Sequence, residues 1–179
     1  LGVIKIFESV RKKLDCQLLL VGSMASDDPE GQYMVEKLEK EIAGKKDIHM
    51  IINAPDIVTN AIQRGSSVII QKSIKEGFAL TVSEALLKGT PVVASNVGGI
   101  PSQVIDGENG FLLEPKDYQG FAEKISWLIK HPNKAKEMGK KGKEHIIENF
   151  LITRHVMDYV QLVREFIGIS ISPCLFNLN

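Results

Sequence analysis

The sequence predicts an α/β domain: a doubly wound parallel sheet with helices on both faces. Short, continuous apolar runs such as 16–22 and 67–70 are typical of strands covered on both sides in a parallel sheet. Segments with apolar residues at helical spacing alternate with these runs. Because alternating strands and helices form layered folds through right-handed crossovers, we expect one such domain in the chain of 179 residues.

The first half of the chain alternates helices with strands. Residues 2–14 carry an apolar stripe and predict an amphipathic helix. The next helix has alternating charges on its outer face, and the one after it ends at Gly65, with Asn53 or Asp56 as its cap. These helices are expected at 2–14, about 31–43 and up to 65, and the strands at 16–22, 48–52 and 67–70.

The central stretch of the chain predicts a loop, a short helix and a buried strand. Thr81 and Glu84 match the S/T-x-x-E pattern of a capping box, which predicts a helix beginning at Thr81. Gly89 is a suitable C-terminal stop. The strand at 91–95 begins with a proline, where a missing N–H donor is tolerated.

The last third of the chain begins with turns and ends with helices. Gly98 and Gly99 predict a turn, residues 103–105 are expected to be extended, and residues 111–113 form a strand. Helices are expected at 117–130, 134–148 and 153–167. Residues 1–168 therefore form the predicted domain, and 169–179 an irregular tail.

The predicted helix start offers a site for a phosphate. The backbone N–H groups of Leu80 and Thr81 lie at the positive end of the helix dipole, and Gly77 lets the main chain approach a ligand closely. Glu76 and Glu84 flank this position. They would repel a bare phosphate, but carboxylates accept short hydrogen bonds from sugar hydroxyls. The stretch therefore predicts a site for a sugar, two phosphates and a ribose in series, as in a nucleotide sugar.

Structural alternatives exist for each of these acidic residues. Glu84 is explained by a capping box without any ligand, and Glu76 by a solvated loop. Asn53 ends a predicted strand at the expected base pocket, but it also suits a helix cap. Residues 27–30 include three acidic side chains, yet they fit a turn and a helix start better than a metal site. With a lone Gly22 in place of a dinucleotide motif, we expect neither a metal nor a cofactor.

Charge and composition exclude several classes of partner. Lys plus Arg and Asp plus Glu both number 22, so no net field would attract nucleic acid or an anionic membrane. No apolar run approaches the roughly 20 residues of a membrane span. Two distant cysteines and no secretory leader favour a cytoplasmic location over a disulfide framework. A homodimer is left open.

Longer motifs resemble a known family. The E-x7-E pattern of Glu76 and Glu84 lies within E-G-F-A-L-T-V-S-E-A-L-L-K-G-T-P-V-V-A-S and is followed by V-G-G-I-P and D-G-E-N-G-F-L. This stretch resembles retaining glycosyltransferases of the GT-B fold, of the family 4 type. The segments 18–22 and 27–31 resemble the trehalose glycosyltransferring synthases and trehalose phosphorylases in particular. The resemblance covers residues 1 to about 168.

The resemblance implies the Rossmann-like, C-terminal donor half of such an enzyme, which moves glucose from a nucleoside-diphosphate sugar to a sugar acceptor. In the family, the position of Glu76 contacts the donor hexose and acts in catalysis, and that of Glu84 binds the ribose. The loop between them continues through Phe78 to Ala79, where the family usually has glycine.

The resemblance also implies that a first strand, a basic loop and an acceptor-binding domain precede residue 1. We therefore expect this fragment alone to be inactive. A phosphorylase, a nucleotide-sugar epimerase and a binding-only module remain alternatives.

Overall fold

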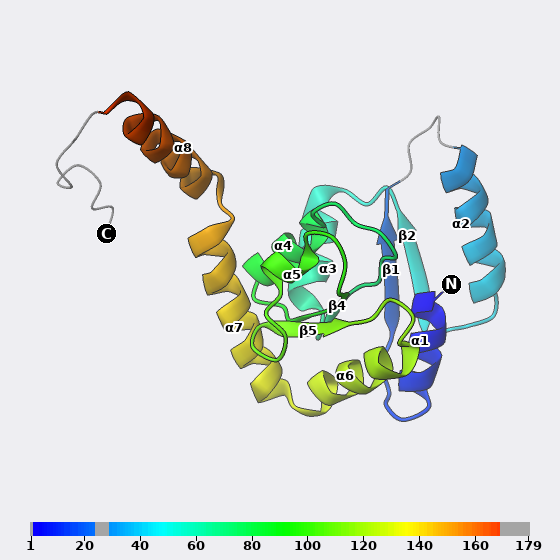
Figure 1. Ribbon diagram of the computed structural model, residues 1–179. Helices are drawn as coiled ribbons and strands as arrows, with labels where there is room; N and C mark the ends of the chain where they lie inside the picture. The colour runs from blue at the N-terminus through cyan, green and yellow to red at the C-terminus, as the bar shows by residue number, and fades with distance from the viewer. Residues whose placement is uncertain (1, 24–28, 169–179) are drawn as a thin grey trace.

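The structure is a computed structural model that describes residues 2–23 and 29–168. Within these ranges eight helices alternate with five strands, which confirms the predicted α/β class (Figure 1). The elements are α1 (Gly2–Arg11), β1 (Leu18–Gly22), α2 (Pro29–Ile42), β2 (Ile48–Ile52), α3 (Asp56–Gly65), β3 (Ile69–Gln71), α4 (Leu80–Leu87), β4 (Val92–Ser95), α5 (Ile100–Gln103), β5 (Gly110–Leu113), α6 (Tyr118–Lys130), α7 (Pro132–Asn149) and α8 (Ile152–Ile167).

All strand pairs are parallel, but they form two sheets. β1 pairs with β2, with Leu18 opposite Ile48. The second sheet has the order β3, β4, β5, with Val92 opposite both Ile69 and Gly110. Over the described residues β1 and β3 are not hydrogen-bonded to each other, so the single continuous sheet expected from the sequence is divided at this point.

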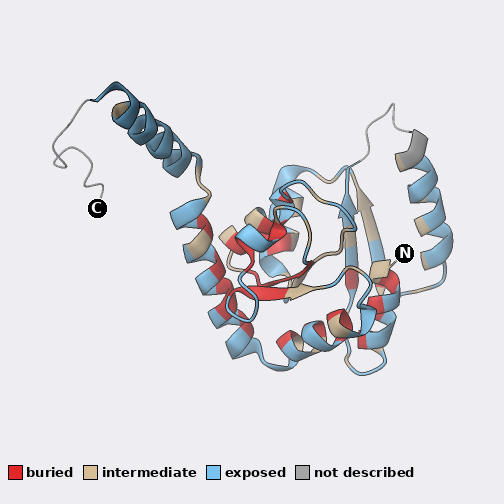
Figure 2. Ribbon diagram, viewed as in Figure 1, coloured by how far each residue is buried: buried red, intermediate tan, exposed pale blue. Residues whose placement is uncertain are grey.

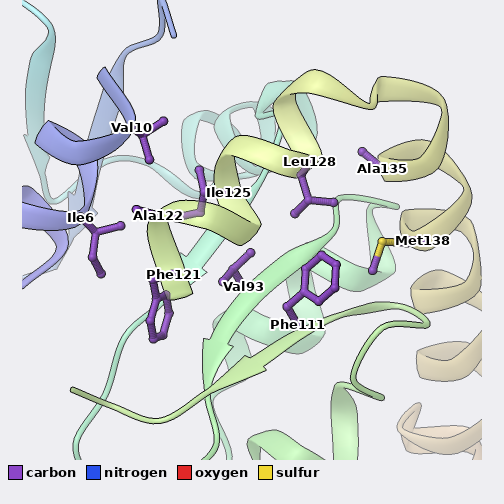
Figure 3. Close-up of a cluster of buried hydrophobic side chains, with 10 residues drawn as sticks. All are labelled: Ile6, Val10, Val93, Phe111, Phe121, Ala122, Ile125, Leu128, Ala135 and Met138. Atoms are coloured by element: carbon purple, nitrogen blue, oxygen red, sulfur yellow. The ribbon is translucent and has the colours of Figure 1, made fainter. Parts of the chain in front are cut away.

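One face of the larger sheet is covered by α1, α6 and α7. Val93 and Phe111 point from β4 and β5 into a cluster that α6 supplies with Phe121 and Ile125 (Figure 3). Ile6 of α1 joins the same cluster, and α1 packs beside α6. Because α1 also packs on β1 and β2 through other side chains, it bridges the two sheets on this face.

The opposite face is covered by α4, with α5 and the end of α7 beside it. Val92 and Ala94, which alternate with Val93 along β4, point into a second cluster with Val82 and Leu86 of α4. All four residues of β4 are buried (Figure 2). β4 is therefore the covered central strand, and it fixes the position of α4 relative to the sheet.

α8 extends away from the body of the domain and buries none of its residues (Figures 1 and 2). Several large apolar side chains lie on its surface, among them Ile152, Val156 and Phe166. Its charged side chains pair locally, as Arg154 does with Asp158 at 2.9 Å. In the described ranges no helix is both long and apolar enough to cross a membrane.

Most predicted elements are confirmed, with local corrections. Gln103 was expected to be extended, but it ends the short helix α5. β1 was expected to be covered on both faces, yet Leu19 and Val21 are 40% and 38% exposed. β3 is only half-buried. The acidic residues 27 and 28 and the tail 169–179 lie outside the described residues.

Candidate functional site

The N-terminus of α4 begins in an unusual backbone conformation. The N-cap is Ala79, with φ 68° in the left-handed region, and no side chain caps the helix. The capping box predicted for Thr81 and Glu84 is therefore wrong, because the turn at Ala79 starts the helix at Leu80. Left-handed backbone costs a residue with a Cβ roughly 1–2 kcal/mol. Such strain is characteristic of ligand-binding loops.

The first amides of α4 have no acceptor within the part of the chain that the structure describes. Neither the N–H of Leu80 nor that of Thr81 donates a hydrogen bond there. Both residues are exposed, with Leu80 at 68%. Free amides and the helix dipole favour an anion at this position.

The loop before α4 is held from behind by a glycine turn. The N–H of Gly99 donates to the carbonyl of Gly77 at 2.7 Å. A Cβ at Gly98, whose φ is +57°, would lie 1.8 Å from the carbonyl oxygen of Glu76. The two segments are therefore in direct backbone contact, which only glycine permits at position 98.

Gln103 also holds this loop in place. Its side chain is fully buried; its Nε2 donates to the carbonyl of Phe78, and its Oε1 accepts from Ser83 at 2.6 Å. The ring of Phe78 lies 5.7 Å from that of Phe150, at the end of α7. α5 and α7 thus fix the loop from two sides.

The carboxylate of Glu76 is oriented by groups at the carboxyl ends of β3 and β4. Its Oε2 accepts from Gln71 Nε2 and from Ser73 Oγ, both at 3.2 Å. Its Oε1 accepts from the N–H of Gly77 at 3.1 Å. The N–H of Ser73 in turn donates to Ser95 Oγ at 3.1 Å. The side chain is therefore positioned by the sheet.

The carboxylate of Glu84 is held by α3. Its Oε2 accepts from Gln63 Nε2 at 2.9 Å, and Oε1 accepts no hydrogen bond from the described residues. Glu84 itself is exposed, whereas Gln63 is buried. One carboxylate oxygen is thus fixed and the other is available to a ligand.

A cavity of about 980 Å3 opens between β1 and β3. Residues 17–23 and 66–71 line it along the two strand edges, and Thr81, Glu84 and Gln63 line it as well. Glu76 does not line the cavity, although Gln71, which holds Glu76, does. The cavity therefore includes the Glu84 side of the predicted site.

Asn53 follows β2 in a left-handed conformation, with φ 55°. Its N–H donates to the carbonyl of Gly22 at 2.9 Å, at the ends of the paired strands. Neither Asn53 nor Asp56 caps α3, because Pro55 occupies the N-cap position. The neighbours Ile52 and Ala54 line the cavity, but Asn53 does not.

The side chains that hold the two glutamates and the loop between them were not predicted from the sequence. Gln71 directly follows the apolar run of β3, at the sheet edge where ligands of doubly wound folds bind. Its position in the sequence could therefore have predicted that it lies at the site. Gln63 and Gln103 lie within helices 21 and 25 residues away from the groups they contact. No local pattern indicates such contacts.

The donors and acceptors at the site are amides and carboxylates. The part of the chain that the structure describes contains no group of three His, Cys, Asp or Glu side chains able to hold a metal ion. Amides at a helix start stabilise negative charge, and the two held carboxylates accept hydrogen bonds from hydroxyls. The arrangement suits a phosphate compound that carries hydroxyl groups on both sides.

This fold is that of the GT-B glycosyltransferases. It superimposes on sucrose-phosphate synthase from Thermosynechococcus elongatus with a TM-score of 0.79 and 27% identity, over 94% of this chain and 43% of that chain. Alr3699/HepE of Anabaena, solved in complex with UDP-glucose, superimposes with a TM-score of 0.72 and 20% identity, over 94% of this chain and 45% of that one. Residues 2–145 match the family of glycosyl transferases group 1, and the chain belongs to this family.

Curated relatives include trehalose enzymes. A trehalose synthase of Pyrococcus horikoshii is 45% identical over 170 residues, which is 93% of this chain and 40% of that protein. A trehalose phosphorylase of Grifola frondosa is 29% identical over 169 residues, which is 88% of this chain and 22% of that protein. The chain thus spans well under half the length of these relatives.

Proposed function

We propose that this chain is the donor-binding domain of a retaining hexosyltransferase. The complete protein would move glucose from a nucleoside-diphosphate sugar to a sugar acceptor, as a trehalose-forming synthase does. The observation that carries this proposal is the free amide end of α4 beside two oriented carboxylates. The 45% identity to a trehalose synthase and the likeness to a structure solved with UDP-glucose support it.

Each site residue has a role in this proposal. The amides of Leu80 and Thr81 bind the phosphate that leaves, and stabilising its developing charge lowers the barrier. Glu76 contacts the hexose and Glu84 the ribose hydroxyls.

The backbone of Gly77, Phe78 and Ala79 forms the loop that approaches the diphosphate, and Asn53 lies toward the base. The leaving phosphate helps to deprotonate the acceptor hydroxyl on the same face of the sugar.

The test is a product assay with the full-length protein. It is incubated with glucose and with ADP-, UDP- or GDP-glucose, and the disaccharide and the configuration of its new bond are read by NMR. The proposal predicts an α-linked product from at least one donor. Absence of product with all three donors would contradict it, as would a β-linked product.

A phosphorylase is the second candidate, because a trehalose phosphorylase is also among the relatives. Inorganic phosphate would bind at the same helix start. Incubating the full-length protein with trehalose and inorganic phosphate distinguishes the two functions. Release of glucose 1-phosphate at a rate above nucleotide-dependent synthesis would favour the phosphorylase.

We further propose that the cavity between β1 and β3 accepts one more parallel strand from the longer protein. Among residues 2–23 and 29–168, β1 and β3 are each paired on one side only, and both edges line the cavity. Such a strand would lie in the part of the cavity that residues 17–23 and 66–71 line, beside the two strand edges.

The position of α1 supports this strand. A Cβ at Gly2, the first residue of α1, would lie 2.7 Å from the side chain of Lys72, which directly follows β3. α1 therefore begins at the carboxyl end of β3, where a strand parallel to β3 would also end. A strand in the cavity could connect to α1 through a short loop at the same sheet edge as Glu76.

A further inference from the structure

Gln63 is a buried polar side chain whose amide nitrogen and amide oxygen both form hydrogen bonds. It is 5% exposed, and it lies on α3 rather than on the central motif. Its Nε2 donates to Glu84 at 2.9 Å, and its Oε1 accepts from Lys88 Nζ at 2.6 Å. Its backbone carbonyl accepts from Thr90 Oγ1 at 2.7 Å. The residue therefore connects α3 to the middle of α4 and to its C-terminal end.

The two partners of the Gln63 amide fix its orientation. The ammonium of Lys88 can only donate, so it must face the amide oxygen. The NH2 group is then directed at Glu84, whose carboxylate can only accept. A flipped amide would place donor against donor and acceptor against acceptor.

The positive charge of Lys88 also strengthens the hydrogen bond between Gln63 and Glu84. A cation that donates to the amide oxygen polarises the amide and strengthens the bond made by its NH2 group. Hydrogen bonds to a carboxylate are stronger than those between neutral groups. Glu84 is thus held in a single direction, with Oε1 left to accept from a ligand.

We infer that Gln63 is a positioning residue that sets the preference of the Glu84 site for nucleotides with intact ribose hydroxyls. The inference rests on the proposed function, because it requires that Glu84 binds the ribose. Gln63 touches no ligand in this account. It acts by keeping the free oxygen of Glu84 where two neighbouring hydroxyls can donate to it.

The test measures a ratio of affinities on the full-length protein. Calorimetric titration compares the nucleoside diphosphate that binds best among ADP, UDP and GDP with its 2′,3′-dideoxy form. In Gln63→Leu the preference for the ribose form should fall at least about fivefold, which corresponds to about 1 kcal/mol, because Glu84 loses the hydrogen bond that orients it. Affinity for the dideoxy form should stay unchanged, which a general loss of structure would not produce.

Two further variants make the test decisive. Lys88→Met removes the ammonium that donates to the Gln63 amide oxygen and should lower the ratio in the same direction. If Gln63→Leu does not fold, the ratio in Lys88→Met decides alone, and an unchanged value overturns the inference. Gln119→Leu is the matched control, because Gln119 donates to Glu123 at 3.0 Å on the exposed face of α6. It should leave the ratio unaltered.

The outcomes separate this inference from the proposed function. If the unaltered protein binds ribose and dideoxy forms equally, Glu84 does not bind ribose and the proposed function loses its support. If the preference is present, disappears in Glu84→Ala and persists in full in Gln63→Leu, the positioning role of Gln63 is overturned. A preference that falls in both variants supports the inference.

Discussion

Gly98 supports the loop that carries Glu76 through direct backbone contact. The N–H of the next residue, Gly99, bonds to the carbonyl of Gly77, so the glycine turn and the loop form one unit. The side chains of Gln71 and Ser73 then orient the carboxylate of Glu76 on that loop. The site is thus assembled from behind by residues that need not contact a ligand themselves.

Gly98→Ala should therefore disable the site. The new Cβ would meet the Glu76 carbonyl at 1.8 Å, and the loop would have to move. Gly107→Ala is the matched control, because its φ of +77° imposes a similar backbone cost with nothing within 4 Å. Urea unfolding should show that Gly107→Ala lowers the free energy of unfolding by about 1 kcal/mol and that Gly98→Ala lowers it by more.

Donor titration of the full-length protein separates the two glycine variants further. Gly98→Ala should weaken binding, whereas Gly107→Ala should retain it. Equal affinities in the two variants would show that the contact between Gly98 and Glu76 does not control the site.

α7 and α8 differ sharply in what they contribute to the domain. Ile146 of α7 is 2% exposed and packs against the cluster around α4. Ile152, at the start of α8, is 72% exposed. The core that positions the candidate site therefore extends to α7 and stops before α8.

A pair of isoleucine variants tests this boundary. In the 179-residue chain, Ile146→Ala should lower the unfolding free energy by about 2–5 kcal/mol, because it leaves a cavity in a packed core. Ile152→Ala should change it by less than about 0.5 kcal/mol, as is usual at exposed positions. Denaturant unfolding measures both. A loss at Ile152 comparable to that at Ile146 would mean that α8 packs on the domain.

The helices and strands could be predicted because their signals are local. The apolar period of α1, α6 and α8 appears within each segment, and their observed ends lie within three residues of those expected. The start of α4 was mispredicted, because the left-handed turn at Ala79 replaces a side-chain cap that the Thr81 pattern indicated. The short helix α5 was missed, since four residues carry no period.

At the scale of the whole molecule, strand pairing could not be predicted, because it joins segments far apart in the chain. The alternation of elements indicated one parallel sheet. Nothing local to β1 or β3 shows that their facing edges find no partner strand in the described part of the chain. The spacing of Glu76 and Glu84 predicted a candidate site at the start of α4. Their partners Gln71 and Gln63 became visible only in the folded chain.

The proposed strand can be tested by extending the chain. Adding the segment that precedes it in the full-length protein should raise the unfolding free energy by about 2–5 kcal/mol, since each buried apolar side chain contributes about 1.5–3 kcal/mol against about 1–2 kcal/mol of backbone ordering. A Gly/Ser extension of equal length is the control. If both extensions give the stability of the original chain, the cavity does not accept a strand.

Cys16 provides a second measurement of the same proposal. It lines the cavity, and burial raises the pKa of its thiol, so its reactive thiolate is scarce at neutral pH. In a Cys174→Ser background, the strand should slow alkylation of Cys16 further, because it would cover the sulfur. The Gly/Ser extension should leave the alkylation rate unchanged.

The central claim is that the start of α4, between Glu76 and Glu84, binds a nucleotide sugar. Calorimetric titration of the full-length protein with ADP-, UDP- and GDP-glucose, repeated on Glu84→Ala, tests it most directly. We expect at least one donor to bind, and the variant to bind it more weakly by about 1–3 kcal/mol, the value of a charge-assisted hydrogen bond. Binding of none of the three donors, or an affinity that Glu84→Ala leaves unchanged, would contradict the claim.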